Sequence, residues 1–230
     1  MLCRRSSRFC RVAVACAVSG FLLWPSVTLA YESFQADVLC AYGSRGEFVC
    51  GDVMARGDFA RMDVTLNKVG EFSLLVDVES RKMRILSRKL KAYVEIFLDS
   101  TADNWRELLM SAASAVMPQS LGLVSLYEKD SQDLGKVRWQ GVSVKRSRHD
   151  FEATFMGKSR RFTIETWEAD KYQPFPVKAM LIGKGGDASG SARLAKVRNT
   201  GPRKEVFSLP EGYVRYTSIM DLLLYALTAL

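Results

Sequence analysis

The sequence predicts a mainly β protein built around one strongly curved antiparallel sheet, with a central helix and a C-terminal helix. Apolar residues alternate with polar ones from Phe34 to Tyr42, a period typical of a half-buried strand. The same pattern returns after each turn signal along the chain. Because about a dozen strands would make an unusually wide flat sheet, we expect a curved sheet or an open barrel.

The predicted strands follow one another at the spacing of a meander. In chain order they cover residues 34–42, 48–54, 62–66, 72–78, 83–85, 90–96, 136–139, 142–145, 151–155, 162–167, 177–182, 193–197 and 206–207. Glycine-rich stretches between them, such as Gly-Lys-Gly-Gly, favour turns. We expect the basic segment 145–150 to be a surface turn that carries the single histidine, His149.

Two segments follow helical rather than strand periodicity. In the first, apolar side chains recur at helical spacing between residues 101 and 117, and Ser100 or Thr101 can cap it. The second is the apolar tail, residues 217–230, which Thr217 can cap. As a helix it would be about 21 Å long, short of the ~30 Å hydrocarbon core. We expect it to fold back over the sheet as a lid, with membrane-surface contact and partner docking as the alternatives.

The first 30 residues have the pattern of a cleavable signal peptide. Four arginines precede an apolar run, and small residues lead up to Ala30, near which we expect cleavage. Removing these four arginines from the 33 basic residues leaves 29 against 25 acidic residues, a net charge of +4. The mature chain is therefore only moderately basic, which gives no indication of nucleic-acid binding.

Cys40 and Cys50 are the two cysteines that remain after this processing. An even pair in an exported protein predicts a disulfide bond. The turn centred near Arg45 places the two cysteines opposite one another on neighbouring strands. Two buried free thiols are the alternative.

The sequence offers little support for an enzyme. No nucleophile with an ordered base accompanies His149, no cysteine or histidine pair has zinc spacing, and the loop 183–191 is not followed by a helix that could hold a phosphate. We therefore expect no enzymatic activity, cofactor or metal. The stretch 81–91 holds six basic residues. It is typical of a strand with one solvated face, and contact with anionic lipid headgroups is the alternative.

Several segments of the sequence resemble those of LolA/LolB-like periplasmic lipoprotein carriers. They are FQADVLCAYGSRGEFVC, LLVDVESRKMRILSRKLKAYVEI, WQGVSVKR, ETWEADKYQPFPVKAML and VFSLPEGY. The resemblance covers Phe34 to about Tyr213, and its closing signature consists of Phe207, Leu209, Pro210, Gly212 and Tyr213. It implies a half barrel of eleven strands with helices across its mouth, which encloses an apolar cavity for acyl chains.

Carriers of this family usually begin with a helix, whereas here only residues 31–33 precede the first strand. The lid would then consist of the segment 105–116 and the tail. The division expected is a signal peptide at 1–30, a LolA-like half barrel at 31–216 and an apolar lid helix at 217–230. The residues expected to line the cavity are Val38, Met62, Val64, Leu74, Val76, Trp105, Leu108, Leu109, Ile219 and Leu223.

The function expected from these observations is non-enzymatic binding, in the periplasm, of lipid or of the acyl chains of lipoproteins. The alternative is a half barrel whose interior is filled by side chains and which serves as a protein-interaction or sensor module of the cell envelope. The partners expected are an acyl chain, an envelope protein and, as a peripheral contact, a membrane.

Overall fold

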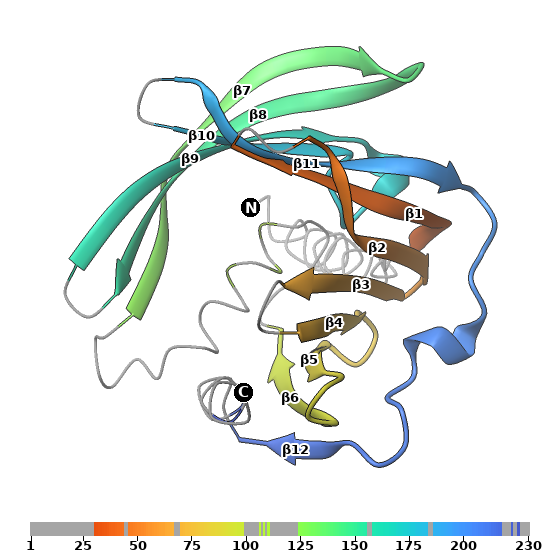
Figure 1. The fold of residues 1–230 in the computed structure, drawn as a ribbon. Coiled ribbons are helices and arrows are strands. Elements are labelled where there is room, and N and C mark those ends of the chain that lie inside the picture. Colours follow the sequence, from red (N-terminus) through yellow and green to blue (C-terminus); the bar gives the residue numbers. More distant parts are fainter. Residues whose placement is uncertain are drawn as a thin grey trace, which may run out of the picture.

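A computed structural model describes residues 30–43, 46–66, 70–98, 106, 108, 110, 124–155, 158–183, 186–217, 222 and 225. These residues form a single twelve-stranded sheet that is strongly curved and open (Figure 1). Its strands are β1 (Tyr31–Tyr42), β2 (Phe48–Gly57), β3 (Phe59–Leu66), β4 (Gly70–Asp77), β5 (Lys82–Ser87), β6 (Ala92–Phe97), β7 (Val124–Trp139), β8 (Val142–Phe155), β9 (Lys158–Glu168), β10 (Lys178–Ile182), β11 (Ala188–Arg198) and β12 (Val214–Tyr216). Two short 3-10 helices, η2 (Asp170–Tyr172) and η3 (Lys204–Phe207), interrupt the connections.

The order of the strands is β12-β6-β5-β4-β3-β2-β1-β11-β10-β9-β8-β7. Neighbouring strands pair antiparallel, except that β12 pairs with β6 in parallel. The prediction of a mainly β fold with a curved antiparallel sheet is confirmed. The described part of the chain has about the dozen strands expected from the pattern, one more than the eleven that the resemblance implies, and β12 and β7 form the two edges.

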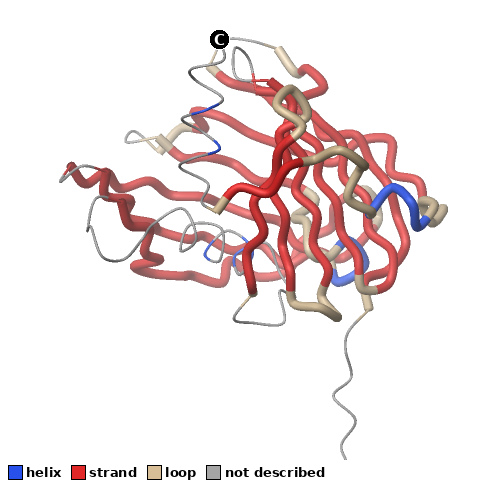
Figure 2. Tube along the Cα trace, turned by 90° about the horizontal axis from the view of Figure 1, so that it is seen from below, coloured by secondary structure: helices blue, strands red, loops and turns tan. Residues whose placement is uncertain are grey.

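We call the face that carries the buried apolar cluster the inner face, and the opposite face the outer face. Cross-strand partners share a face, so Ala36, Val53, Met62 and Leu74 form one inner row across β1, β2, β3 and β4. Figure 2 shows how the strands curl around one side of the molecule. Curvature of this kind lets side chains of distant strands approach one another over the inner face.

The two predicted helices lie largely outside the described residues. Helical backbone is present at Arg106, Leu108, Met110, Leu222 and Tyr225. Leu108 and Leu222 are 4% and 1% exposed and belong to the same buried cluster as the inner face. Apolar side chains from both segments therefore pack into the core of the sheet.

The connection between β11 and β12, residues 199–213, crosses the outer face (Figure 1). The Arg56 and Arg61 guanidinium groups donate hydrogen bonds to the carbonyls of Pro202 and Val206. The Phe207 ring stacks on Phe59 with 5.8 Å between ring centroids. The prediction of a strand at 206–207 is wrong, because these residues belong to η3. Phe207, the first residue of the closing signature, thus helps to hold the connection that leads to β12, which pairs with β6.

The predicted division of β8 into two strands with a surface turn is also wrong. β8 runs without interruption from Val142 to Phe155 and pairs with β7 and β9. Within the segment read as a turn, Ser147 and His149 are 5% and 2% exposed, whereas Arg146 and Arg148 point to the other face. The arginines that indicated a turn lie on one face of this strand.

The disulfide between Cys40 and Cys50 is present, with 5.7 Å between the two Cα atoms. The register differs from the one predicted. Cys40 lies opposite Phe48, while Val38 pairs with Gly51 and Leu39 with Val49, so Cys50 is the extra residue of a β-bulge. The bond therefore joins the hairpin diagonally, between a regular position and the bulge.

We expect the mature protein to take up no thiol-alkylating label until a reductant is added, because the bond occupies both of its thiols. Intact mass before and after reduction measures this. Two labels taken up without reductant would show that the bond does not form. Removal of the bond by Cys50→Ser should cost ~2 kcal/mol of unfolding free energy, since the loop that it closes is short.

Candidate functional site

The inner face brings together the described members of the predicted cavity. Met62 pairs with Leu74, Ala60 with Val76, and Val64 with Phe72, so the predicted residues of β3 and β4 share one face. Val38 in β1 joins them through Gly51, which pairs with Val38 on one side and with Val64 on the other. Val76 is 2% exposed, and Val38, Met62 and Leu74 pack against the buried cluster. Whether these residues contact a ligand stays a prediction.

A small apolar pocket of about 100 Å³ opens on this face. Its lining comes from β1, β2, β3, β10, β11 and the segment after η2: Val38, Val53, Met62, Phe175, Pro176, Ala179, Ala192, Arg193 and Leu194. An apolar cavity of about 150 Å³ accommodates a benzene-sized molecule. In the conformation described, this pocket therefore admits only a few carbon atoms.

Sequence reasoning missed the contribution of the segment between β9 and β10. The Tyr172 ring packs edge-on against Phe34 with 5.2 Å between centroids. The backbone N–H of Val177 donates to the Trp167 carbonyl, and the N–H of Leu194 donates to the Val177 carbonyl. These contacts hold Phe175 and Pro176 at the pocket. The proline on either side of Phe175 is the sequence signal that could have indicated a fixed loop.

Of the remaining predicted cavity residues, Leu108 is buried in the core, as described above. Trp105, Leu109, Ile219 and Leu223 lie outside the described residues. Residues 1–29, all but the last residue of the predicted signal peptide, also lie outside them.

A buried polar network occupies the inner face where β7, β8 and β9 meet. His149 Nδ1 lies 2.8 Å from Glu128 Oε1 and 3.3 Å from Ser131 Oγ. On the other side of the ring, Nε2 lies 3.4 Å from Thr166 Oγ1 and 4.0 Å from Glu168 Oε1. Sequence reasoning missed this network because it placed His149 in a turn.

The order carboxylate, histidine, hydroxyl resembles the arrangement that activates a nucleophile. Thr166, however, is 0% exposed and donates its hydroxyl proton to Glu168 at 2.7 Å. Arg106 Nη1 lies 3.6 Å from the Glu128 carboxylate, which links the network to the segment with helical backbone. The geometry is that of a satisfied buried network, and it gives no argument for catalysis.

The outer face of β8, β9 and β10 carries a cluster of cations around Glu165 and Trp167. Arg146 and Arg148 each hold one oxygen of the Glu165 carboxylate at 2.6 Å. Trp167 lies between the Arg146 guanidinium and the Lys178 ammonium, 5.1 and 4.7 Å from the ring centroid. Cation–π contacts of this kind hold the ring at a defined position on the sheet.

Burial alone would raise the pKa of Glu165, but the hydrogen bonds from Arg146 and Arg148 outweigh it and hold the pKa below its usual value. A carboxyl group whose folded-state pKa is depressed stabilises the fold above its usual titration range. That contribution is lost as the pH falls through the lowered pKa. The cluster therefore contributes to stability at neutral pH and stops doing so in acid.

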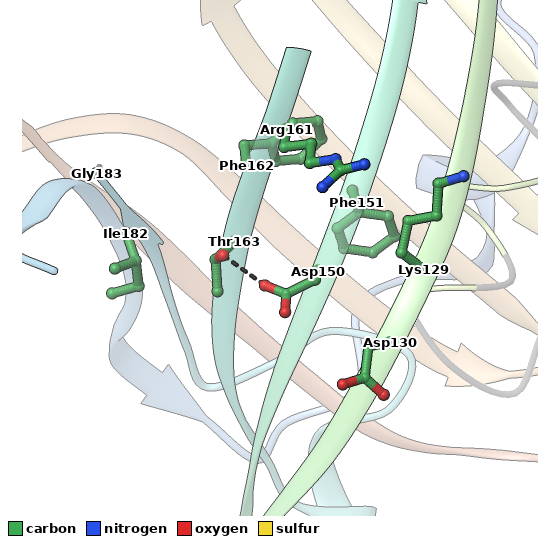
Figure 3. Close-up of a pocket in the computed structure, with 9 residues that line it drawn as sticks. All are labelled: Lys129, Asp130, Asp150, Phe151, Arg161, Phe162, Thr163, Ile182 and Gly183. Carbon is green, nitrogen blue, oxygen red and sulfur yellow. Dashed lines mark hydrogen bonds between the residues drawn. The ribbon is translucent and has the colours of Figure 1, made fainter. Parts of the chain in front are cut away.

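A second pocket, of about 430 Å³, lies elsewhere, beside β7, β8 and β9 (Figure 3). Asp150 accepts a hydrogen bond from the Thr163 hydroxyl. Arg161 and Lys129 at this pocket form ion pairs with Glu152 at 3.1 and 3.6 Å. Its lining mixes four charged side chains with the apolar side chains of Phe151, Phe162 and Ile182. Among the described residues, no group of three acidic, histidine or cysteine side chains is placed to hold a metal ion.

No helix in the part of the chain that the structure describes is long and apolar enough to cross a membrane.

No protein-family model matches the chain, and no curated protein matches it. Among solved structures, an uncharacterized conserved protein from Thermus thermophilus is 11% identical over 87% of this chain and 99% of that chain, with a TM-score of 0.46. The Mycobacterium tuberculosis lipoprotein LppX is 13% identical over 86% of this chain and 99% of its own, with a TM-score of 0.31.

The structure of the Pseudomonas aeruginosa MucA/MucB complex is 12% identical over 84% of this chain, with a TM-score of 0.33. This chain spans 60% of the length of the chain that it matches there. Because all three TM-scores are below 0.5, these likenesses carry no argument about family, ligand or partner. The resemblance to LolA/LolB-like carriers stays a prediction.

Proposed function

We propose that the protein is an exported, non-enzymatic carrier or receptor that binds the acyl chain of a lipid or lipoprotein in the periplasm. The observation that carries the proposal is the apolar inner face, on which the register aligns side chains from β1, β2, β3 and β4 around an apolar pocket. Burial of each methylene group would contribute about 0.8 kcal/mol to binding.

The core that adjoins this small pocket contains the side chains of Leu108 and Leu222. A chain longer than a few carbons would have to take the place of such side chains. The segments that carry them are the two lids predicted from the sequence, and Tyr225 of the second one stacks on Tyr216 of β12 at 5.9 Å between centroids. In this proposal the ligand displaces the lids from the inner face and makes the same apolar contacts.

The burial of Leu108 and Leu222 also favours a second candidate function. If these side chains never leave the core, the sheet has a filled interior and acts as an interaction or sensor module for an envelope protein. Organic extraction and mass spectrometry of protein purified without detergent distinguish the two functions. Bound lipid supports the first candidate, and its absence together with a lack of dye uptake supports the second.

We expect Leu74→Asn to weaken uptake of the apolar dye N-phenyl-1-naphthylamine at least about tenfold, because an unpaired amide on the inner face opposes an apolar ligand. Leu74→Met should bind nearly as the parent protein does. The control is Val137→Asn on β7, where the side chain is 38% exposed and lies away from the pocket. Leu75 does not serve as a control, since it is 3% exposed on the outer face. Equal losses at Leu74 and Val137 would contradict a binding role for the inner face.

A further inference from the structure

Four exposed apolar side chains lie at one end of the sheet, in the β1–β2 hairpin and at the end of β10. Tyr42, Phe48, Val49 and Leu181 are 68%, 43%, 60% and 37% exposed. We call Tyr42, Phe48 and Leu181, which share the inner face, the tip patch; Val49 lies beside them on the outer face. Exposed apolar side chains scattered singly need no explanation, but a group on adjacent strands indicates a site of interaction.

The register makes three of these residues neighbours on the inner face. Tyr42 pairs with Gly190 of β11, and Gly190 pairs with Leu181 of β10, so the three positions form one row. A Cβ atom at Gly190 would lie 3.3 Å from Cδ2 of Tyr42, which shows that the ring lies against this glycine. Phe48 shares the same face through its pairing with Cys40. The glycine thus leaves room for an aromatic side chain to extend toward Leu181.

The tip patch continues the apolar pocket along the same strands. Val38, Ala192 and Ala179 line the pocket on β1, β11 and β10. Because side chains two residues apart share a face of a strand, Leu181 lies one step beyond Ala179. On β1 the step from Val38 leads through Cys40 to Tyr42, and the disulfide fixes the hairpin at this point. An apolar track therefore connects the pocket with the exposed tip.

Cations lie on the other face of the same strands. Val49 pairs with Leu39, which pairs with Arg193, and Arg193 pairs with Lys178. Lys178 lies over the Trp167 ring, and Arg193 holds Glu47 at 2.6 Å. Exposed apolar and aromatic side chains beside basic ones are typical of surfaces that contact the interface of an anionic bilayer.

We propose that the tip patch docks onto an anionic lipid bilayer and is the portal through which an acyl chain enters the pocket. The inference rests on the proposed function, because it names the source of the acyl chain. A bilayer is the occupant that fits best, since the ligand itself resides there and the apolar track ends at the surface that would contact it.

Vesicle flotation tests the docking. We expect the double variant Tyr42→Ser, Leu181→Ser to bind vesicles of phosphatidylcholine and phosphatidylglycerol at least about tenfold more weakly than the parent protein. The matched control is Phe97→Ser, Val214→Ser, whose side chains are 64% and 62% exposed at the other end of the sheet. Circular dichroism confirms that each variant is folded, and the single change Tyr42→Ser replaces the double variant if that one is not.

Binding of a short fluorescent fatty acid below its micellar concentration separates the two proposals. This soluble probe needs the pocket but no membrane, so the tip variant should bind it as the parent protein does. Failure of the parent protein to bind the probe would overturn the proposed function. Suppose that the parent protein binds the probe. The portal proposal is then wrong if the parent protein does not bind vesicles, and it is also wrong if the tip variant and the control variant bind vesicles equally. A protein partner would then be the better occupant of the tip patch.

Discussion

We expect the Gly51→Ala variant to lose about 3 kcal/mol or more of unfolding free energy, because the added methyl group has no space. A Cβ atom at Gly51 would lie 2.0 Å from the backbone oxygen of Asp63 and 3.2 Å from the Cα atom of Val64. Both atoms belong to the backbone of β3, so relief requires β2 and β3 to separate. The disulfide at the preceding residue, Cys50, hinders such a shift on the other side.

Gly46 provides the matched control in the same hairpin. A Cβ atom there would meet no atom within 4 Å, and its backbone does not require glycine. Gly46→Ala should therefore change the unfolding free energy by less than about 0.5 kcal/mol. Denaturant unfolding curves of both variants measure the difference. Equal midpoints for the two variants would show that β3 does not approach Gly51 as closely as described.

The alternation of apolar and polar residues was sufficient to predict most of the sheet. It identified strands where one face is buried and the other more exposed, as in β6, where Val94 and Ile96 are buried and Phe97 is exposed. The pair of cysteines on either side of a local turn likewise predicted the Cys40–Cys50 bond. Such features are set by residues that are near one another in the sequence, so a single sequence contains the information that they need.

The course of β8 could not be predicted in the same way. Its middle carries Arg146 and Arg148, which resemble turn residues until Glu165 of β9 is placed beside them. The parallel pairing of β12 with β6 likewise depends on contacts far apart in the sequence, such as those of Arg61 with the segment around Val206. Where a distant partner satisfies a charge or a backbone group, local patterns do not reveal the element.

In the candidate site, too, local patterns predicted some features, whereas others depend on distant contacts. Val38 and Met62 were predicted to line a cavity from strand periodicity, and the pocket contains them both. Phe175 and Pro176 were missed, because the loop that holds them packs against β1 through Tyr172 and Phe34. Periodicity identifies the face of a strand, whereas the loop that covers this face is fixed by tertiary contacts.

We expect the His149→Ala variant to lose about 2–4 kcal/mol of unfolding free energy, although a surface turn would have predicted almost no effect. The imidazole is 2% exposed, so its removal leaves a cavity. It also removes the partner that lies 2.8 Å from the Glu128 carboxylate and 3.4 Å from the Thr166 hydroxyl. Since these groups come from β7 and β9, the loss should loosen both strands beside β8.

Two further variants separate the polar contribution from the cavity. Asparagine can place its amide nitrogen near the position of Nδ1, so His149→Asn should recover part of the lost stability through Glu128. Lys145→Ala changes a side chain of the same strand that is 54% exposed and should stay within about 0.5 kcal/mol of the parent protein. Thermal and denaturant unfolding measure all three variants. If His149→Ala is as stable as Lys145→Ala, the ring is not buried between the strands; if His149→Asn is no better than His149→Ala, the ring acts by filling space rather than through its contact with Glu128.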